Sequence, residues 1–409
     1  MSGNGRKLAG VAGFSDLEER KAFGDYAYDA VEEPKFRTRD WGMSKYSGTA
    51  EPIDYLIDGV LPRATPGLIA SSGGLGKSYL LLDLCVRVAA GPGQFGQYAL
   101  GGVIRDRGRA VMVTAEDSHR AVHRRLDQIL HPSDKAALED YLYIVPLPDA
   151  GGSVTFMQTV GGQYVMTKDW TDFCDDMKSF DHIDLIVADP LQTLVAADIT
   201  SDPAAAQAYW SAVSVLCAET GACVLTAHHM RKGSGEITSV QQAKEAVRGT
   251  SALTDGSRWS YALYTATDEE RDTASQALGY SIGPLEFCWG AVIKSNDIGS
   301  TEPRAFLRDP ETGLLIDRTE ELQKDVAAIQ RVSDEQRQQI FDEVSYRWGT
   351  NRPFSSHPNA GARWLGRWMV DTFGITRGAA RQYIRQWIDD QMLVITYNST
   401  ARLKGLRVG

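Results

Sequence analysis

The stretch "SSGGLGKSYL", residues 71–80, places three glycines, one lysine and several hydroxyl side chains between two apolar runs. The run before it predicts a strand, and the run after it predicts a helix. Gly73, Gly74 and Gly76 allow successive backbone N–H groups to turn toward one anion, and the helix N-terminus adds its dipole. The spacing fits the phosphate-loop signature G-x-x-x-x-G-K-[ST], with Ser71 at the first glycine position. It therefore predicts a phosphate-binding loop rather than a plain glycine turn.

In such a loop the lysine, here Lys77, reaches the β- and γ-phosphates, and the next hydroxyl, here Ser78, ligates Mg²⁺. The metal also needs a carboxylate from a neighbouring strand, and Asp189 follows the apolar run "LIVA". Alone, a strand that ends in Asp-Pro predicts only a turn, but together with a phosphate loop it predicts a magnesium ligand. We therefore expect ATP and Mg²⁺ as cofactors. The residues expected to line the nucleotide are Ser72, Gly73, Gly74, Leu75, Gly76, Lys77, Ser78 and Tyr79.

The stretch "VMVTAEDS" places Glu116 and Asp117 at the end of another apolar run, where ligands gather in open α/β sheets. Glu116 is the candidate for polarising an attacking water molecule. The alternative is that this segment only begins the following helix, because Asp117 or Ser118 would serve equally well as its N-cap.

The rest of the chain has the composition of an ordinary globular protein. Its 409 residues are 43% hydrophobic and 23% charged, which suits about two or three domains. No apolar stretch reaches the ~18 residues of a membrane span, and the N-terminus lacks the apolar segment of a signal peptide. The five scattered cysteines show no metal-ligand spacing. We therefore expect reduced core thiols, no membrane partner and a cytoplasmic location.

Apolar runs alternate with helical patterns between residues 52 and 320, which predicts an α/β domain with a mostly parallel sheet and crossover helices. Residues 1–50 are polar and aperiodic and predict an N-terminal arm, whereas residues 330–409 predict a small helical domain. The ATPase domain is expected to span residues 51–320. The expected strands are "GLIAS", "RAVMVTA", "YLYIVPL", "IDLIVAD", "ACVLTAH" and "FCWGAVIKS".

The C-terminal segment is basic, although the whole chain has a net charge of −10. Ser333 and Gln336 predict a capping box, and Thr376 predicts the N-cap of a later helix. This later helix carries a stripe of exposed cations at i, i+4 and i+8, and a basic strand segment with Lys404 follows. The order resembles a winged helix that binds duplex DNA; the alternative is a solvated helix face on a protein-interaction module. The stripe consists of Arg377, Arg381 and Arg385.

Taken together, these segments resemble RecA-type ATPases, and in their details the plasmid RepA-type hexameric replicative helicases. The resemblance covers about residues 52–300 and implies a RecA-like P-loop core. It rests on "SSGGLGKSYLLLDL", "AEDSHRAVHRRL", "ADPLQTL", "VLTAHHMRKG", "VRGTSALTDGSRW" and "VIKSND".

The resemblance implies a role for several side chains. Glu116 matches the catalytic glutamate of the family, and His228 or His229 matches its γ-phosphate sensor. Arg248 matches the arginine finger that such enzymes insert into the site of a neighbouring subunit. Lys294 ends another strand and is expected to assist, the alternative being a solvated lysine at a strand terminus.

In RecA-like rings the loop after the sensor strand faces a central pore. Here that loop carries Arg231, Lys232 and Lys244, which suit the backbone of single-stranded DNA; the alternative is an ordinary surface loop. The sequence thus predicts an ATP-hydrolysing DNA motor that forms a homo-oligomeric ring, expected to be a hexamer, in a plasmid or phage-like element. The alternatives are an ATP-switched DNA-binding regulator or helicase loader and a recombinase-like filament ATPase.

Overall fold

The computed structural model describes residues 37–93, 95, 97–230, 237, 239–247, 251–297 and 302–409. The chain divides into two compact units, Met1–Pro52 and Ile53–Gly409. The described part of the first unit contains two 3₁₀ turns, η2 (Thr38–Trp41) and η3 (Met43–Tyr46), and neither turn buries a side chain.

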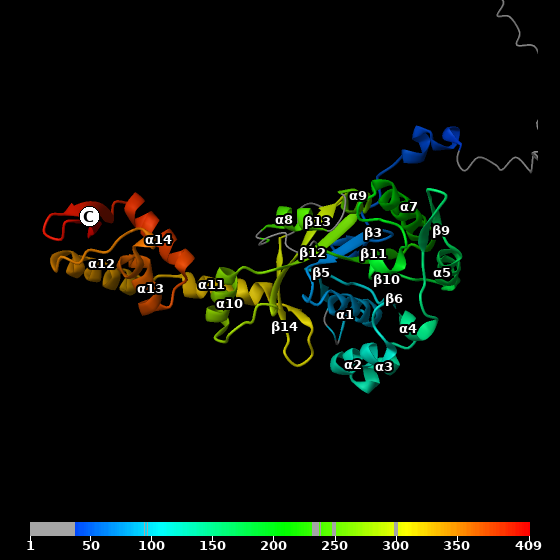
Figure 1. Ribbon diagram of the computed structural model, residues 1–409, viewed down its shortest axis with the longest axis horizontal. Helices are drawn as coiled ribbons and strands as arrows, with labels where there is room; N and C mark the ends of the chain where they lie inside the picture. Colours follow the sequence, from blue (N-terminus) through cyan, green and yellow to red (C-terminus); the bar gives the residue numbers. More distant parts are fainter. Residues whose placement is uncertain are drawn as a thin grey trace, which may run out of the picture. The chain divides into compact units, whose positions relative to one another are not determined.

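A nine-stranded sheet forms the centre of the second unit (Figure 1). The six strands from β12 to β7 run parallel, and β13, β14 and β15 continue the sheet as antiparallel strands. In spatial order the strands are β15 (Leu315–Asp317), β14 (Arg304–Arg308), β13 (Phe287–Ser295), β12 (Trp259–Thr265), β3 (Pro66–Ser71), β11 (Cys223–His229), β10 (Leu185–Asp189), β6 (Ala110–Thr114) and β7 (Leu142–Pro146).

Helices cover both faces of this sheet, which is why its central strands are apolar on both sides. Helix α1 packs on one face and α7 on the other, as Figure 1 shows. The helices that precede the C-terminal segment are α1 (Lys77–Ala90), α2 (His119–Ile129), α3 (Pro132–Ala137), α4 (Leu147–Ala150), α5 (Lys168–Ser179), α6 (Leu191–Leu194), α7 (Pro203–Thr220), α8 (Val240–Ala246), α9 (Ser251–Gly256), α10 (Asp268–Leu278) and α11 (Thr319–Gln330).

Three short hairpins decorate the sheet. They are β1 (Tyr55–Ile57) with β2 (Leu61–Pro62), β4 (Tyr98–Ala99) with β5 (Gly102–Val103), and β8 (Met157–Val160) with β9 (Gln163–Met166).

The predicted α/β class with a mostly parallel sheet is confirmed, and all six expected runs are strands of this sheet. Two details differ from the prediction. The run Phe287–Ser295 is antiparallel to its neighbour, and the strand Trp259–Thr265 was not expected at all. Its run "WSYALYT" follows a short polar stretch that hides the boundary between α9 and β12.

The C-terminal segment has a hydrophobic core of its own, which includes Ile340, Trp364, Ile384, Trp387 and Leu406. It contains α12 (Asp334–Gly349), η4 (Pro358–Arg363), α13 (Leu365–Phe373), α14 (Arg377–Asp389) and the antiparallel hairpin of β16 (Leu393–Asn398) and β17 (Leu403–Val408). The structure confirms the capping box at the start of α12 and the N-cap of α14. The assignment of this segment as a winged helix stays a prediction.

Two further expectations concern the chain as a whole. Within the described ranges, no helix is both long and apolar enough to cross a membrane. All five cysteines are free thiols, and all but Cys174 are buried, as the sequence predicts.

The close packing of the central sheet can be tested at Leu225. This side chain is fully buried in β11, and a Cβ placed on Gly67 of β3 would lie 2.5 Å from its Cδ2 atom. Leu225→Ala should lower the free energy of unfolding by about 2–5 kcal/mol, because it removes buried methyl groups and leaves a cavity. Val215→Ala on the exposed face of α7 is the control and should change it by less than about 0.5 kcal/mol. Equal effects of the two substitutions in urea unfolding would contradict this packing.

Candidate functional site

The loop between β3 and α1 has the backbone form that an anion requires. The strand ends at Ser71, the helix begins at Lys77, and Gly74 and Gly76 have φ angles of 82° and 93°. Left-handed angles of this kind favour glycine and let neighbouring N–H groups converge. A Cβ built on Gly73 would meet no atom within 4 Å, so the space over the loop is open.

Lys77 and Asp189 form a buried ion pair beside this loop. The distance from Lys77 Nζ to Asp189 Oδ1 is 2.5 Å, and the two side chains are only 6% and 4% exposed. Asp189 ends β10, on the sheet face where Leu185 and Val187 pack against α1. The structure therefore brings together the two charged residues that the sequence assigns to phosphate and to magnesium.

The donor set at this position fits a magnesium nucleotide. The hydroxyl of Ser78 and the carboxylate of Asp189 are oxygen ligands of the kind that Mg²⁺ prefers. The ammonium of Lys77 and the loop amides suit phosphate oxygens. Ser78 is half-buried and directly follows Lys77 in the first turn of α1.

Glu116 lies next to Asp189 at the same edge of the sheet. Thr114, the last residue of β6, is paired with Asp189 in the strand register, and the N–H of Ala115 donates to the Asp189 carbonyl at 2.8 Å. The carboxylate of Glu116 is exposed, and no hydrogen bond or ion pair joins it to another described residue. Ser118 is the N-cap of α2, so Glu116 is not needed for capping.

A network that the sequence did not predict surrounds Glu116. Asp117 accepts from both terminal nitrogens of Arg125, with Nη2 at 2.9 Å from Oδ1. The guanidinium of Arg125 also lies 4.9 Å from the ring centroid of Tyr79, and the Tyr79 hydroxyl donates to Gln128 at 3.3 Å. Arg125 thus connects the first turn of α1 with the segment that carries Glu116.

The strand register separates the two histidines. Thr226 points toward α7, because its hydroxyl lies 2.8 Å from that of Tyr209, and His228 two residues later points the same way. His228 is fully buried there. His229 follows Leu225 and Ala227, which pack on the α1 face, and it pairs in register with Ser71. Only His229 therefore shares the face and the strand end of the phosphate loop.

Arg308 is a second residue at the loop that the sequence did not single out. Its Nη2 atom donates to the carbonyl of Gly74 at 3.0 Å, and a Cβ built on Gly76 would lie 2.9 Å from the same nitrogen. Arg308 ends β14, an antiparallel strand beyond the expected parallel sheet. No local motif marks it, because 234 positions separate it from Gly74.

Lys294 does not join this chain's own phosphate loop. Its ammonium donates to the carbonyls of Asp255 and Ser257, the latter at 2.5 Å, and the residue pairs with Ser260 near the start of β12. It therefore lies toward the opposite edge of the parallel strands. Burial lowers the pKa of Lys294, and the charges of Lys244 and Arg258 lower this pKa further, although Asp255 opposes them. Three cations thus gather around that edge.

The remaining predicted residues fall into two groups. Arg231, Lys232 and Arg248 lie outside the described residues. On α14 the predicted arginine stripe, together with Lys404 on β17, is exposed. The guanidinium groups of Arg377 and Arg381 each lie 5.9 Å from the Trp364 ring centroid.

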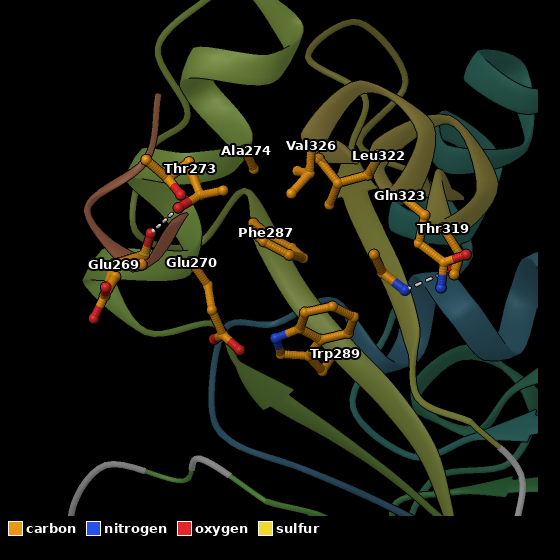
Figure 2. A pocket seen from close by; sticks show the side chains of 13 residues that line it. Glu269, Glu270, Thr273, Ala274, Phe287, Trp289, Thr319, Leu322, Gln323 and Val326 are labelled. Carbon is orange, nitrogen blue, oxygen red and sulfur yellow. Dashed lines mark hydrogen bonds between the residues drawn. The ribbon is translucent and has the colours of Figure 1, made fainter. Parts of the chain in front are cut away.

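A separate apolar pocket of about 330 Å³ lies among α10, β13 and α11 (Figure 2). The rings of Phe287 and Trp289 and the side chains of Leu322 and Val326 surround it, and Glu270 lies nearby. None of the described residues that line this pocket belongs to the phosphate loop. Its apolar walls, without a lysine or arginine, do not suit a triphosphate.

Residues 32–235 match the family model described as an AAA domain. This span contains Lys77, Glu116, Asp189 and both histidines, and it ends before Arg248. Among solved structures, one ATPase domain is similar to this chain, with a TM-score of 0.42 and 12% sequence identity, over 62% of this chain and 84% of that chain. The domain match and the loop geometry support a RecA-like P-loop ATPase.

The buried ion pair makes a prediction for the nucleotide-free protein. Lys77→Met or Asp189→Asn alone should lower the free energy of unfolding by about 3–5 kcal/mol, because each leaves one buried charge unpaired. The double variant should lose much less than the sum of the two. The exposed pair of Lys168 and Asp172 on α5, with side chains 83% and 60% exposed, is the control. Additive losses at Lys77 and Asp189 in a double-mutant cycle would contradict the pairing.

Proposed function

We propose that this chain is an ATP- and Mg²⁺-dependent DNA motor of the RepA-type hexameric helicase class, acting in replication of a plasmid or phage-like element. The observation that carries the ATPase part is the buried contact between Lys77 and Asp189 beside an open glycine loop. The DNA part rests on the motif resemblance and on the cations described above.

In the proposed reaction, Lys77 leaves Asp189 and turns to the terminal phosphates of ATP. Asp189 and Ser78 are then free to hold the magnesium and its water shell. The bound metal would supply Lewis-acid polarisation of the phosphate oxygens. Because Lys77 and Asp189 neutralise each other before binding, this exchange never leaves a lone buried charge.

Glu116 is the proposed base that orients and polarises the attacking water. Its backbone is held beside Asp189, while the contact between Asp117 and Arg125 fixes the segment that follows. His229 is the proposed γ-phosphate sensor, since its strand neighbours place it on the α1 face next to Ser71. The loop that follows His229 would carry the signal toward DNA.

Ring assembly would complete the site from a second copy of the chain. In a cyclic ring each interface joins two different faces of the protomer. The phosphate loop lies at one edge of the parallel strands, and the cations Lys244, Arg258 and Lys294 lie near the other edge. We propose that this second edge faces a neighbour's nucleotide, with Arg248 as the arginine finger and Lys294 assisting.

The pore is the proposed site for single-stranded DNA, contacted by Arg231, Lys232 and Lys244. For duplex DNA the proposed surface is α14 with the β16–β17 hairpin, read as a winged helix. The exposed arginine stripe favours a second candidate function, an ATP-switched regulator or loader that binds duplex DNA without sustained unwinding. A filament-forming ATPase would use the same phosphate site, and electron microscopy would show open helices instead of closed rings.

The trans arrangement can be tested by mixing two inactive variants. Glu116→Gln should lower turnover by about 10²–10⁴-fold and Arg248→Ala by about 10³–10⁵-fold, while both still bind ATP. In a 1:1 mixture about a quarter of the interfaces should pair an intact Glu116 with an intact Arg248 and regain turnover. Full turnover of Arg248→Ala alone, or a mixture that stays inactive, would rule out a finger supplied by the neighbour.

The role of α14 separates the motor from the regulator. Replacing Arg377, Arg381 and Arg385 by glutamine should reduce the salt slope of duplex binding by about 2.7, if each contacts one phosphate. A motor should keep its ATPase stimulation by single-stranded DNA, because that DNA binds in the pore. The control replaces Arg337 and Arg347 on α12, which are ion-paired with Asp334 and Glu343. Loss of the stimulation only in the α14 variant would favour the regulator, and an unchanged slope would exclude α14 as a DNA surface.

A further inference from the structure

The guanidinium of Arg308 connects three separate segments at the phosphate loop. It donates to the carbonyls of Gly74 at 3.0 Å, Gly313 at 3.2 Å and Leu285 at 3.4 Å. A planar group with five donors can satisfy several acceptors in one fixed orientation, which a lysine ammonium cannot do as well. The arrangement therefore depends on arginine in particular.

The same region packs against the loop and against α1. The Cδ1 atom of Leu285 would lie 3.5 Å from a Cβ built on Gly74. A Cβ built on Gly313, in the turn between β14 and β15, would lie 3.4 Å from the ring of Tyr79. Arg308 is thus held between two segments that already contact the loop and its helix.

The direction of the contact matters for anion binding. In a phosphate loop the N–H groups converge on the anion, so the carbonyls of the same peptides point away from it. Arg308 takes one of these outward carbonyls, at Gly74, and its Nη2 atom approaches the neighbouring Gly76. It can therefore hold the loop in its binding form while adding positive charge near the phosphates.

The charge balance singles out Arg308 among the nearby cations. Lys77 is paired with Asp189, Arg125 with Asp117, and Arg304 on the same strand with Asp317. None of the carboxylates in the described part of the chain forms an ion pair with Arg308. Its positive charge is met only by carbonyl dipoles, which leaves it able to attract an incoming anion.

We propose that Arg308 is a positioning residue of the nucleotide site, which fixes the phosphate loop through Gly74 and raises the affinity for the phosphates of ATP and ADP. The inference rests on the proposed nucleotide binding. It adds a cation from the same chain, distinct from the arginine finger that a neighbour supplies.

The test compares Arg308→Gln, Arg308→Lys and the control Arg304→Gln, which alters the other end of β14. The probe is fluorescent mant-ADP with Mg²⁺. Arg308→Gln should weaken binding about tenfold, Arg308→Lys should restore part of it, and Arg304→Gln should stay within about twofold of wild type. The difference between wild type and Arg308→Gln should shrink as salt rises, because screening weakens a charge effect. In ATP hydrolysis, KM should rise more than kcat falls.

The outcomes separate this inference from the proposed function. If the wild-type chain binds no mant-ADP, the nucleotide site itself is wrong. If wild type binds and Arg308→Gln binds equally well, the role of Arg308 is wrong. A loss that is independent of salt and not rescued by lysine would show a purely structural role and would also overturn the proposal. Thermal unfolding by circular dichroism confirms that each variant is folded before binding is measured.

Discussion

The buried ion pair between Lys77 and Asp189 is the contact on which the site depends. Two charges that are almost entirely removed from water are stable only as neighbours, and they remain neighbours only if β3 and β10 keep their places around β11. The sheet order, the close contact of Leu225 with Gly67 and the start of α1 at Lys77 all maintain this distance. A magnesium nucleotide would replace one balanced set of charges by another.

The fold distributes the remaining chemistry over two edges of the parallel strands. The loop, Glu116, Asp189 and His229 lie at the carboxyl edge, where ligands collect in open α/β sheets. The cations near Lys294 lie toward the amino edge and cannot act on the same nucleotide. The antiparallel strand β14 returns to the carboxyl edge and brings Arg308 back to the loop. A single chain thus presents one nearly complete site and one set of cations without an anion.

The sequence predicted what short spacing determines. The phosphate loop, Asp189, the α/β class and the helix caps in the C-terminal segment are local patterns, and each lies where it was expected. The choice between His228 and His229 needed the strand register, which no single run contains. The contacts of Arg308 and Arg125 were missed because they join distant segments through single side chains. The position of Lys294 depended on β13 being antiparallel, which the alternating pattern of strands and helices did not reveal.

The most direct measurement of the central claim is isothermal titration calorimetry of the purified chain with ATPγS, with and without Mg²⁺. The account predicts one nucleotide bound per chain, tighter binding with the metal, and no binding by the Lys77→Met variant. It also predicts that Asp189→Asn abolishes the gain from Mg²⁺, because this carboxylate is the proposed link to the metal. If the wild-type chain gave no binding heat, or if Lys77→Met bound as well as wild type, the phosphate site described here would be contradicted.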